Sequence, residues 1–182
     1  MQSIDVLGIE QAPTRKELIE VVTKAYDYFP EGIWRGIRYI GELKIPKSYQ
    51  IRWNEKVYRA FDFEILVERM KRLRDGHKID GPLLGLTIDP VMSVLCRFEN
   101  GKLLRDFYCI HDAVIGNIGI VSLFRVDEEY SKKLVAHNLG HNRRLSHHTD
   151  PIDFMYTGLI TEKRKLQNEP FCRKCEKILK EG

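Results

Sequence analysis

The chain has 182 residues, of which 43% are hydrophobic and 31% are charged. This length and balance fit one soluble globular domain with a single sizeable core. No apolar run approaches the length needed to cross a membrane, and residues 1–6 lack the basic and apolar regions of a secretory signal. We therefore expect a cytoplasmic protein that does not insert into a membrane.

The formal net charge of +4 is concentrated toward the C-terminus. Residues 1–129 contain 19 Lys and Arg and 20 Asp and Glu, whereas residues 130–182 contain 11 and 6. The basic residues of this second part include four short runs, namely Lys132-Lys133, Arg143-Arg144, Lys163-Arg164-Lys165 and Arg173-Lys174. Such a bias is typical of a solvated charged surface, or of a surface that attracts a polyanion or an acidic peptide.

The first half of the chain predicts two strands and two helices. The apolar run at 4–9 indicates a buried strand, and Thr14 with Glu17 forms the capping box of a helix that continues toward Phe29. The following patterns predict, in order, a strand at 33–43, a loop at 44–59 and a helix at 61–74.

The second half predicts several short strands and two more helices. A hairpin turn is expected at Glu99-Asn100-Gly101-Lys102, and a third helix is expected to begin at Asp127 or Ser131. Residues 96–98 lead into this turn, and the remaining expected elements are three strands at 83–88, 107–110 and 118–124 and a short terminal helix at 174–180. Alternating strands and helices predict an α/β domain with a mixed sheet.

The four cysteines fall into two kinds. Cys96 and Cys109 lie in apolar, strand-like stretches and are expected to be buried thiols. Cys172 and Cys175 form Cys-Arg-Lys-Cys, which is the spacing of a metal knuckle or a redox pair. A disulfide framework is not expected in a cytosolic protein of this size.

Three histidines have the spacing of metal ligands. His137 and His141 are four residues apart, so on a helix they share one face and can hold one ion. His147 follows six residues later, which leaves room for the chain to turn back. This is the ligand spacing of the zinc motif H-E-x-x-H-x-x-G-x-x-H. In this sequence Asn138 stands at the Glu position and Arg144 at the Gly position.

With the residues that follow, this motif resembles the archaemetzincins, a branch of the metzincin zinc peptidases found in archaea and vertebrates. The family pattern continues with a Cys after the third His, then C-x-M and a final C-x-x-C. Here His148 takes the place of the first Cys and Asp153 that of the second, Met155 takes the Met place, and Cys172 and Cys175 match the final pair.

The resemblance implies a zincin-like metzincin fold of the α/β (α+β) class. It implies a mixed twisted sheet with two packed helices, an active-site helix and a small C-terminal subdomain. We therefore expect a single domain at 1–182, in which 1–147 holds the sheet and the zinc helix and 148–182 forms the subdomain.

The resemblance also implies two zinc ions with different roles. A catalytic zinc is held by the histidines, here His137, His141 and His147, and Met155 lies in a turn beneath it. A structural zinc is held in the family by four cysteines, whose places are taken here by His148, Asp153, Cys172 and Cys175. These donors are acceptable to zinc, so one or two zinc ions are expected, although imidazole accepts other divalent ions as well.

Asn138 bears on whether the site hydrolyses peptides. In such enzymes the Glu takes a proton from the attacking water and returns it to the leaving amine. An amide has no usable pKa, and loss of a general base typically costs on the order of 10²–10⁴ in rate. The sequence therefore predicts a zinc-binding protein with impaired peptidase activity, retained as a binding or regulatory module for a peptide or protein ligand.

Two alternative functions stay open. The first is an active zinc-dependent peptidase with a substitute base, for which Asp112, Glu128 and Asp150 are candidates. The second, which the sequence favours less, is a nucleic-acid- or protein-binding zinc module that uses the basic C-terminal part.

The geometry of the turn before the third histidine is open too. Either Arg144 adopts a positive φ, at a cost of roughly 1–2 kcal/mol, or Asn142 or a shifted turn absorbs the bend.

Overall fold

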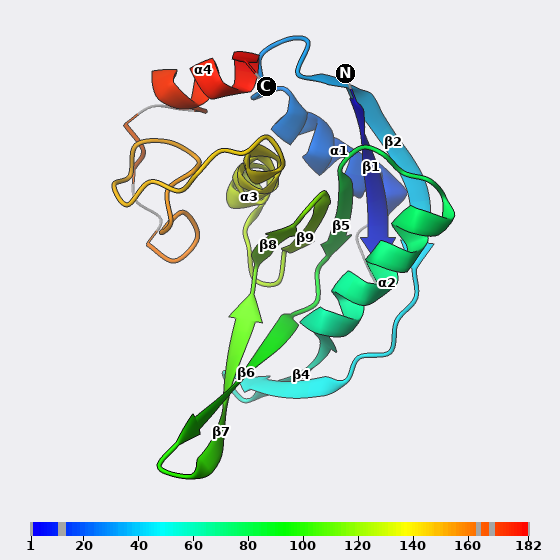
Figure 1. The fold of residues 1–182 in the computed structure, drawn as a ribbon, viewed down its shortest axis with the longest axis vertical. Coiled ribbons are helices and arrows are strands. Elements are labelled where there is room, and N and C mark those ends of the chain that lie inside the picture. The colour runs from blue at the N-terminus through cyan, green and yellow to red at the C-terminus, as the bar shows by residue number, and fades with distance from the viewer. Residues whose placement is uncertain (1, 11–13, 163–164, 168–169, 182) are drawn as a thin grey trace.

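The computed structural model describes residues 2–10, 14–162, 165–167 and 170–181. Within these residues the chain forms an α/β fold with two sheets and four helices (Figure 1). The elements are, in order, β1 (Gln2–Ile9), α1 (Arg15–Tyr26), β2 (Trp34–Leu43), β3 (Tyr49–Trp53), β4 (Lys56–Asp62), α2 (Phe63–Gly76), β5 (Leu83–Thr87), β6 (Val91–Glu99), β7 (Lys102–Ile110), β8 (Asp112–Ile115), β9 (Ile118–Ser122), α3 (Glu128–Asn142) and α4 (Arg173–Glu181).

The larger sheet has the order β2-β1-β5-β9-β8. The neighbouring pairs are parallel except β8 and β9, which are antiparallel. Both faces are covered, so its inner strands are apolar along their length. Ile4 and Val6 of β1 join a core that includes residues of α1 and α3, whereas Leu7 and Ile9 join a second core that includes residues of α2.

The ends of α1 and α3 follow the capping signals in the sequence. The Thr14 side chain accepts a hydrogen bond from the Glu17 N–H, and the Glu17 carboxylate accepts one from the Thr14 N–H, which confirms the predicted capping box. Of the two predicted starts of the third helix, the structure has the earlier one, with Asp127 as its N-cap.

The prediction of a loop at 44–59 is wrong, because this segment contains β3 and most of β4. The two strands form an antiparallel hairpin with the two-residue turn Asn54-Glu55, whose φ values are 44° and 64°. This is the backbone of a hairpin turn that usually carries glycine. The missing glycine and the exposure of many side chains in both strands concealed the hairpin in the sequence.

The predicted hairpin turn at Asn100-Gly101 is confirmed, but its strands are longer than expected. β6 and β7 form a ribbon that projects from the body of the protein (Figure 1). Cys96 and Cys109 lie on this ribbon and are exposed, so the prediction that both thiols are buried is wrong. Cys96 lies toward the outer part of the ribbon, which little of the protein covers, whereas Cys109 lies near its base, opposite Met92, and is exposed there as well.

The C-terminal part packs against the helices near the first sheet. Phe154, Phe171 and Leu179 belong to the same hydrophobic core as residues of α1 and α3. The strand β8, which the sequence did not predict, is an edge strand of the larger sheet and contacts α3. None of the helices in the described residues is both long and apolar enough to cross a membrane.

Candidate metal centre

The helix α3 carries the first two histidines, of which His137 is buried and His141 is partly buried. Asp127 caps its N-terminus by accepting a hydrogen bond from the Tyr130 N–H at 2.9 Å. Residues 133–140 are buried, because the sheet, α1 and the C-terminal part surround this stretch of helix. The four-residue spacing puts the rings of His137 and His141 on one face, with 4.7 Å between their centroids.

A tight turn then returns the chain so that the third histidine meets the first two. The Leu145 N–H donates to the Gly140 carbonyl at 3.0 Å, and the Arg144 N–H donates to the His141 carbonyl at 2.9 Å. These are the two hydrogen bonds of a helix end closed by a left-handed residue. Arg144 has a φ of 65°, so the first of the two expected turn geometries is the one present. The turn brings His147 over the helix end.

The Nε2 atoms of His137, His141 and His147 converge, and we call these residues the first site. The distances between these atoms are 3.0 Å for His137 and His141, 3.1 Å for His137 and His147, and 2.9 Å for His141 and His147. A tetrahedral zinc ion with bonds of about 2.0–2.1 Å separates two nitrogen ligands by roughly 3.3 Å. The triangle is therefore close to the size that zinc requires.

Hydrogen bonds on the far side of two rings determine where the protons lie. His137 Nδ1 lies 2.6 Å from the Phe154 carbonyl oxygen, and His141 Nδ1 lies 2.9 Å from the Leu145 carbonyl oxygen. A carbonyl only accepts, so in the neutral rings Nδ1 carries the proton. Both Nε2 lone pairs then point at each other across 3.0 Å. A shared cation relieves this repulsion, and the carbonyl partners are those typical of metal-binding histidines.

Burial keeps these rings ready for a metal. It lowers the pKa of His137 to about 4 and also lowers the pKa of His141. A metal ligand must be deprotonated, so protons compete weakly with a metal for His137 at neutral pH. Donor type, protonation and spacing of the first site all fit zinc.

Asn138, at the position of the motif glutamate, is fully buried between α3 and the sheet. Its Nδ2 donates to Asp112 Oδ1 at 2.5 Å and to the Ala113 carbonyl at 3.1 Å. On the other side its Oδ1 lies against Gly119, where an added Cβ would be 2.0 Å from that oxygen. Asn138 therefore connects α3 to β8 and β9, and there is little space around it.

A carboxylate does lie beside the first site, and it belongs to Asp112, the first residue of β8. Asp112 Oδ2 is 3.5 Å from His137 Nε2, and the side chain is 16% exposed. Burial raises the pKa of Asp112 to about 6, although the hydrogen bond from Asn138 acts in the opposite direction. The other two candidate bases are placed differently. Glu128 is 89% exposed in the first turn of α3, and Asp150 is exposed in the loop after His147.

Met155 lies directly against the helix that carries the first two ligands. It is fully buried, and an added Cβ on Gly140 would meet its Sδ at 2.7 Å. Gly140 lies between His137 and His141 on α3, so this close approach requires glycine at that position. The Met155 N–H donates to Asp153 Oδ1 at 2.7 Å.

A cavity of about 250 Å³ adjoins the first site. One side is formed by Asp112, His137 and His147. The rest of its wall, which is largely apolar with two hydroxyl-bearing threonines, is made chiefly by Leu134, Tyr156, Thr157, Leu159, Ile160 and Thr161. A space of this size is suited to one side chain of a larger ligand.

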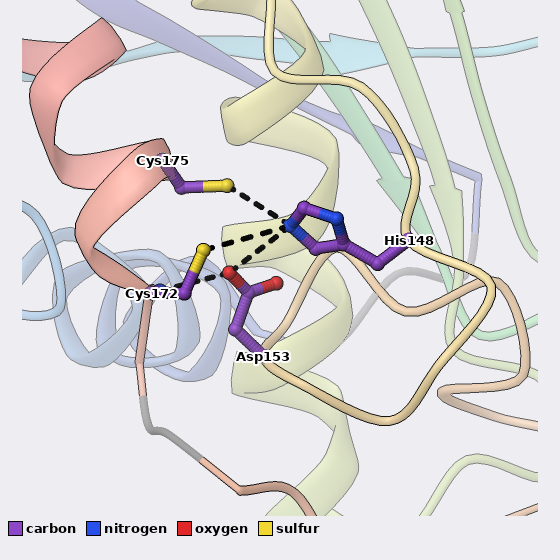
Figure 2. Close-up of side chains that lie close together, drawn as sticks. All are labelled: His148, Asp153, Cys172 and Cys175. Atoms are coloured by element: carbon purple, nitrogen blue, oxygen red, sulfur yellow. Dashed lines mark hydrogen bonds and ion pairs between the residues drawn. The ribbon is translucent and has the colours of Figure 1, made fainter.

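Figure 2 shows a second cluster, formed by His148, Asp153, Cys172 and Cys175, which we call the second site. His148 Nε2 lies 3.2 Å from Cys175 Sγ, 3.7 Å from Cys172 Sγ and 3.4 Å from Asp153 Oδ2. Tetrahedral zinc separates nitrogen from sulfur ligands by roughly 3.5 Å and nitrogen from oxygen ligands by roughly 3.3 Å. The four donors are thus close to the positions that zinc requires.

The carboxylate of the second site is already oriented by the backbone. Asp153 Oδ1 accepts from the Met155 N–H at 2.7 Å, and Oδ2 accepts from the Cys172 N–H at 2.8 Å. Burial raises the pKa of Asp153, but these hydrogen bonds outweigh it and the pKa is lowered overall. Burial raises the pKa of the Cys175 thiol, so metal binding there must displace a proton.

The structure thus brings together every residue that the sequence assigned to each site, in two separate clusters. The sequence did not distinguish Asp112 from the other two acidic candidates. Its place before the apolar residues 113–115 marks the start of a strand, but its contact with Asn138 depends on how β8 lies beside α3. No local pattern carries that information.

Comparison with known proteins identifies the class of fold. No family model and no curated protein matches the sequence. Among solved structures, the archaemetzincin of Methanopyrus kandleri matches with a TM-score of 0.64 and 17% identity, over 99% of this chain and 94% of that chain. A zinc-dependent peptidase from Methanocorpusculum labreanum matches with a TM-score of 0.58 and 15% identity, over 97% and 99%. The chain therefore has the archaemetzincin fold, as the motif resemblance predicted.

Proposed function

We propose that this protein is a zinc-dependent peptidase in which Asp112 is the general base. One observation carries the proposal. Asp112 Oδ2 lies 3.5 Å from His137 Nε2, and Asp112 borders the cavity beside the first site. The first site therefore has a neighbouring carboxylate even though position 138 carries an amide. A base must lie within hydrogen-bond reach of the proton it removes, directly or through one water, and Asp112 is the candidate carboxylate beside the histidines.

Each residue of the first site then has a defined task. His137, His141 and His147 would hold the metal through their Nε2 atoms. Zinc in such a site polarises a peptide carbonyl and lowers the pKa of a coordinated water. Asp112 accepts the proton of the attacking water at Oδ2 and returns it to the leaving amine. Asn138 holds Asp112 in place by donating to Oδ1 at 2.5 Å, which leaves Oδ2 for the proton.

The surroundings of the site favour an extended peptide as the substrate. β8 begins with Asp112 and, in the part of the chain that the structure describes, pairs with a strand on one side only. A peptide can add to such an edge through backbone hydrogen bonds. The cavity of about 250 Å³ then receives one side chain, and Leu134, Leu159 and Ile160 in its wall favour an apolar one.

A second candidate function is a zinc protein that binds peptides without cleaving them. It is favoured by Asn138, which cannot accept a proton, and it agrees with the impaired activity predicted from the sequence.

Binding of nucleic acid has less support. Lys133 is 10% exposed and pairs with Glu129 at 3.2 Å, and Arg143 lies 5.3 Å from the Trp34 ring centroid. Residues 163–164 of the basic runs lie outside the described residues.

Peptide cleavage by the zinc-loaded protein tests the proposal. We would incubate it with a complex peptide mixture and identify new termini by mass spectrometry, with and without a chelator. Asp112→Asn should lower kcat/KM by roughly 10²–10⁴ with the zinc content unchanged, while Glu128→Gln should cleave like the wild type. Unchanged cleavage by Asp112→Asn would overturn the role of Asp112. Zinc-dependent peptide binding without cleavage by the wild type would establish the second candidate instead.

A further inference from the structure

The first and second sites share a short stretch of chain. His147 belongs to the first site and His148, the next residue, to the second, so their Cα atoms are about 3.8 Å apart. The backbone of His148 is held on both sides. Its N–H donates to the Met155 carbonyl at 2.8 Å, and its carbonyl accepts from the Thr157 N–H at 3.0 Å. A displacement of His148 is therefore passed to His147 without a flexible spacer.

A second connection runs through Asp153 and Phe154. Asp153 Oδ2 lies 3.4 Å from His148 Nε2 in the second site. The carbonyl of the next residue, Phe154, accepts the hydrogen bond from His137 Nδ1 at 2.6 Å. This carbonyl orients a ligand of the first site. Loss of such a partner typically weakens metal binding by about 10–100-fold, so the position of Asp153 matters to His137.

A third connection runs through Met155. Asp153 Oδ1 accepts from the Met155 N–H at 2.7 Å, and the Met155 thioether packs against Gly140, which lies between His137 and His141 on α3. One oxygen of Asp153 thus faces the second site, and the other positions the side chain that supports the first.

The remaining ligands of the second site come from the C-terminal end of the chain. Cys175 lies in the first turns of α4 and Cys172 just before it, and their sulfur atoms face the His148 ring (Figure 2). Among the described residues, the Cys172 N–H donates to Asp153 Oδ2 at 2.8 Å, and the Cys175 and Cys172 thiols lie 3.2 Å and 3.7 Å from His148 Nε2. The N–H of Phe154, next to Asp153, donates to the Pro170 carbonyl at 3.2 Å. A bound zinc ion would add one bond to each of the four ligands and would thereby fix His148 and Asp153 relative to α4.

We propose that the two sites are energetically coupled, so that zinc in the second site raises the zinc affinity of the first. The second site acts by fixing His147, the Phe154 carbonyl and Met155. This inference rests on the proposed function only in requiring that both sites bind zinc, and it does not require hydrolysis. Coupling between binding sites is reciprocal and typically amounts to about 5–150-fold. We expect about tenfold, the lower end of the range for residues that orient metal ligands.

Zinc titration of the full chain in competition with a chromophoric chelator tests the coupling. Cobalt(II) can replace zinc to show which site is filled. Within the described residues only the second site has thiol ligands, and bound thiolates give a charge-transfer absorption that histidine ligands do not. Cys175→Ser empties the second site but leaves both backbone hydrogen bonds to Asp153. It should lower first-site affinity about tenfold. Cys96→Ser, at an exposed thiol on β6, is the matched control and should change neither affinity.

The reverse measurement separates coupling from a local packing defect. His141→Ala removes a first-site ligand and should lower second-site affinity by the same factor as Cys175→Ser lowers first-site affinity. Cys172→Ser, at a half-buried position, repeats the test if Cys175→Ser does not fold. Equal first-site affinity in Cys175→Ser and the wild type, or an effect in one direction only, would overturn the coupling. Absence of zinc from the histidines of the wild type would refute the proposed function instead.

Discussion

Restoring the glutamate of the zinc motif separates two views of position 138. The motif alone predicts that Asn138→Glu regains a general base and with it activity. The structure predicts the opposite, because Asn138 is fully buried and its amide donates to Asp112 Oδ1 and to the Ala113 carbonyl. An ionised carboxylate has no proton to donate in either hydrogen bond. We expect Asn138→Glu to destabilise the protein and to leave peptidase activity no higher than in the wild type.

The magnitude follows from three effects at this position. Loss of two hydrogen bonds costs about 1 kcal/mol each. The longer side chain must enter a space where Oδ1 already lies against Gly119, and such overpacking typically costs about 1–3 kcal/mol. Carboxylates at 138 and 112 would also be too close for both to ionise. We expect the free energy of unfolding to fall by about 3–5 kcal/mol in total, against about 5–15 kcal/mol for a typical domain.

Urea unfolding of chelator-treated protein at neutral pH measures this loss, and two variants separate its causes. Asn138→Gln has the length of Glu without its charge, so it should lose less stability. Adding Asp112→Asn to Asn138→Glu removes the second carboxylate and should recover about 1–3 kcal/mol as the interaction energy of the pair. If Asn138→Glu were as stable as the wild type and gained peptidase activity, the structural role assigned to Asn138 would be wrong.

Local geometry sets three further expectations. Arg144→Gly should raise the free energy of unfolding by about 1 kcal/mol, because residue 144 has a φ of 65°; unchanged urea stability would contradict this. Gly140→Ala should weaken zinc binding at the first site, because the new Cβ meets Met155 Sδ at 2.7 Å; chelator competition measures it, and wild-type affinity would refute it. The pKa of Asp112 is raised from 3.8 to about 6, so the folded state binds more protons than the unfolded state in this range. The free energy of unfolding of the metal-free wild type should therefore fall relative to that of Asp112→Asn as pH rises from 3.8 to about 6. Urea unfolding across this range measures it, and an equal pH dependence in the two proteins would contradict the expectation.

Sequence patterns predicted the buried elements of the fold and missed those that lie near solvent. Strands such as β5, covered on both faces, are continuous apolar runs, and α1 carries its own capping signal at Thr14 and Glu17. The hairpin of β3 and β4 lacks both kinds of signal, since its turn at Asn54-Glu55 contains no glycine and many of its side chains are exposed. Its structure is set by pairing between strands, which a local pattern does not record.

The site residues also divide into those that a local pattern records and those that only the fold brings together. His137 and His141 are one helical turn apart, and Cys172 and Cys175 are three residues apart, so short-range spacing was enough to suggest both clusters. Asp112 and Asn138 are 26 residues apart, and they meet only because β8 lies at the edge of the sheet beside α3. Asp112, the residue that we propose as the general base, was therefore not singled out by sequence spacing.

Metal content per chain tests most directly whether the chain holds zinc at two sites, as we propose. Elemental analysis of purified protein should give close to two zinc ions per chain for the wild type, and about one for His141→Ala and for Cys175→Ser. Each variant removes a ligand from one site only. A His141→Ala variant that keeps the zinc content of the wild type would contradict the claim for the histidine site, and a wild type without zinc would contradict it for both.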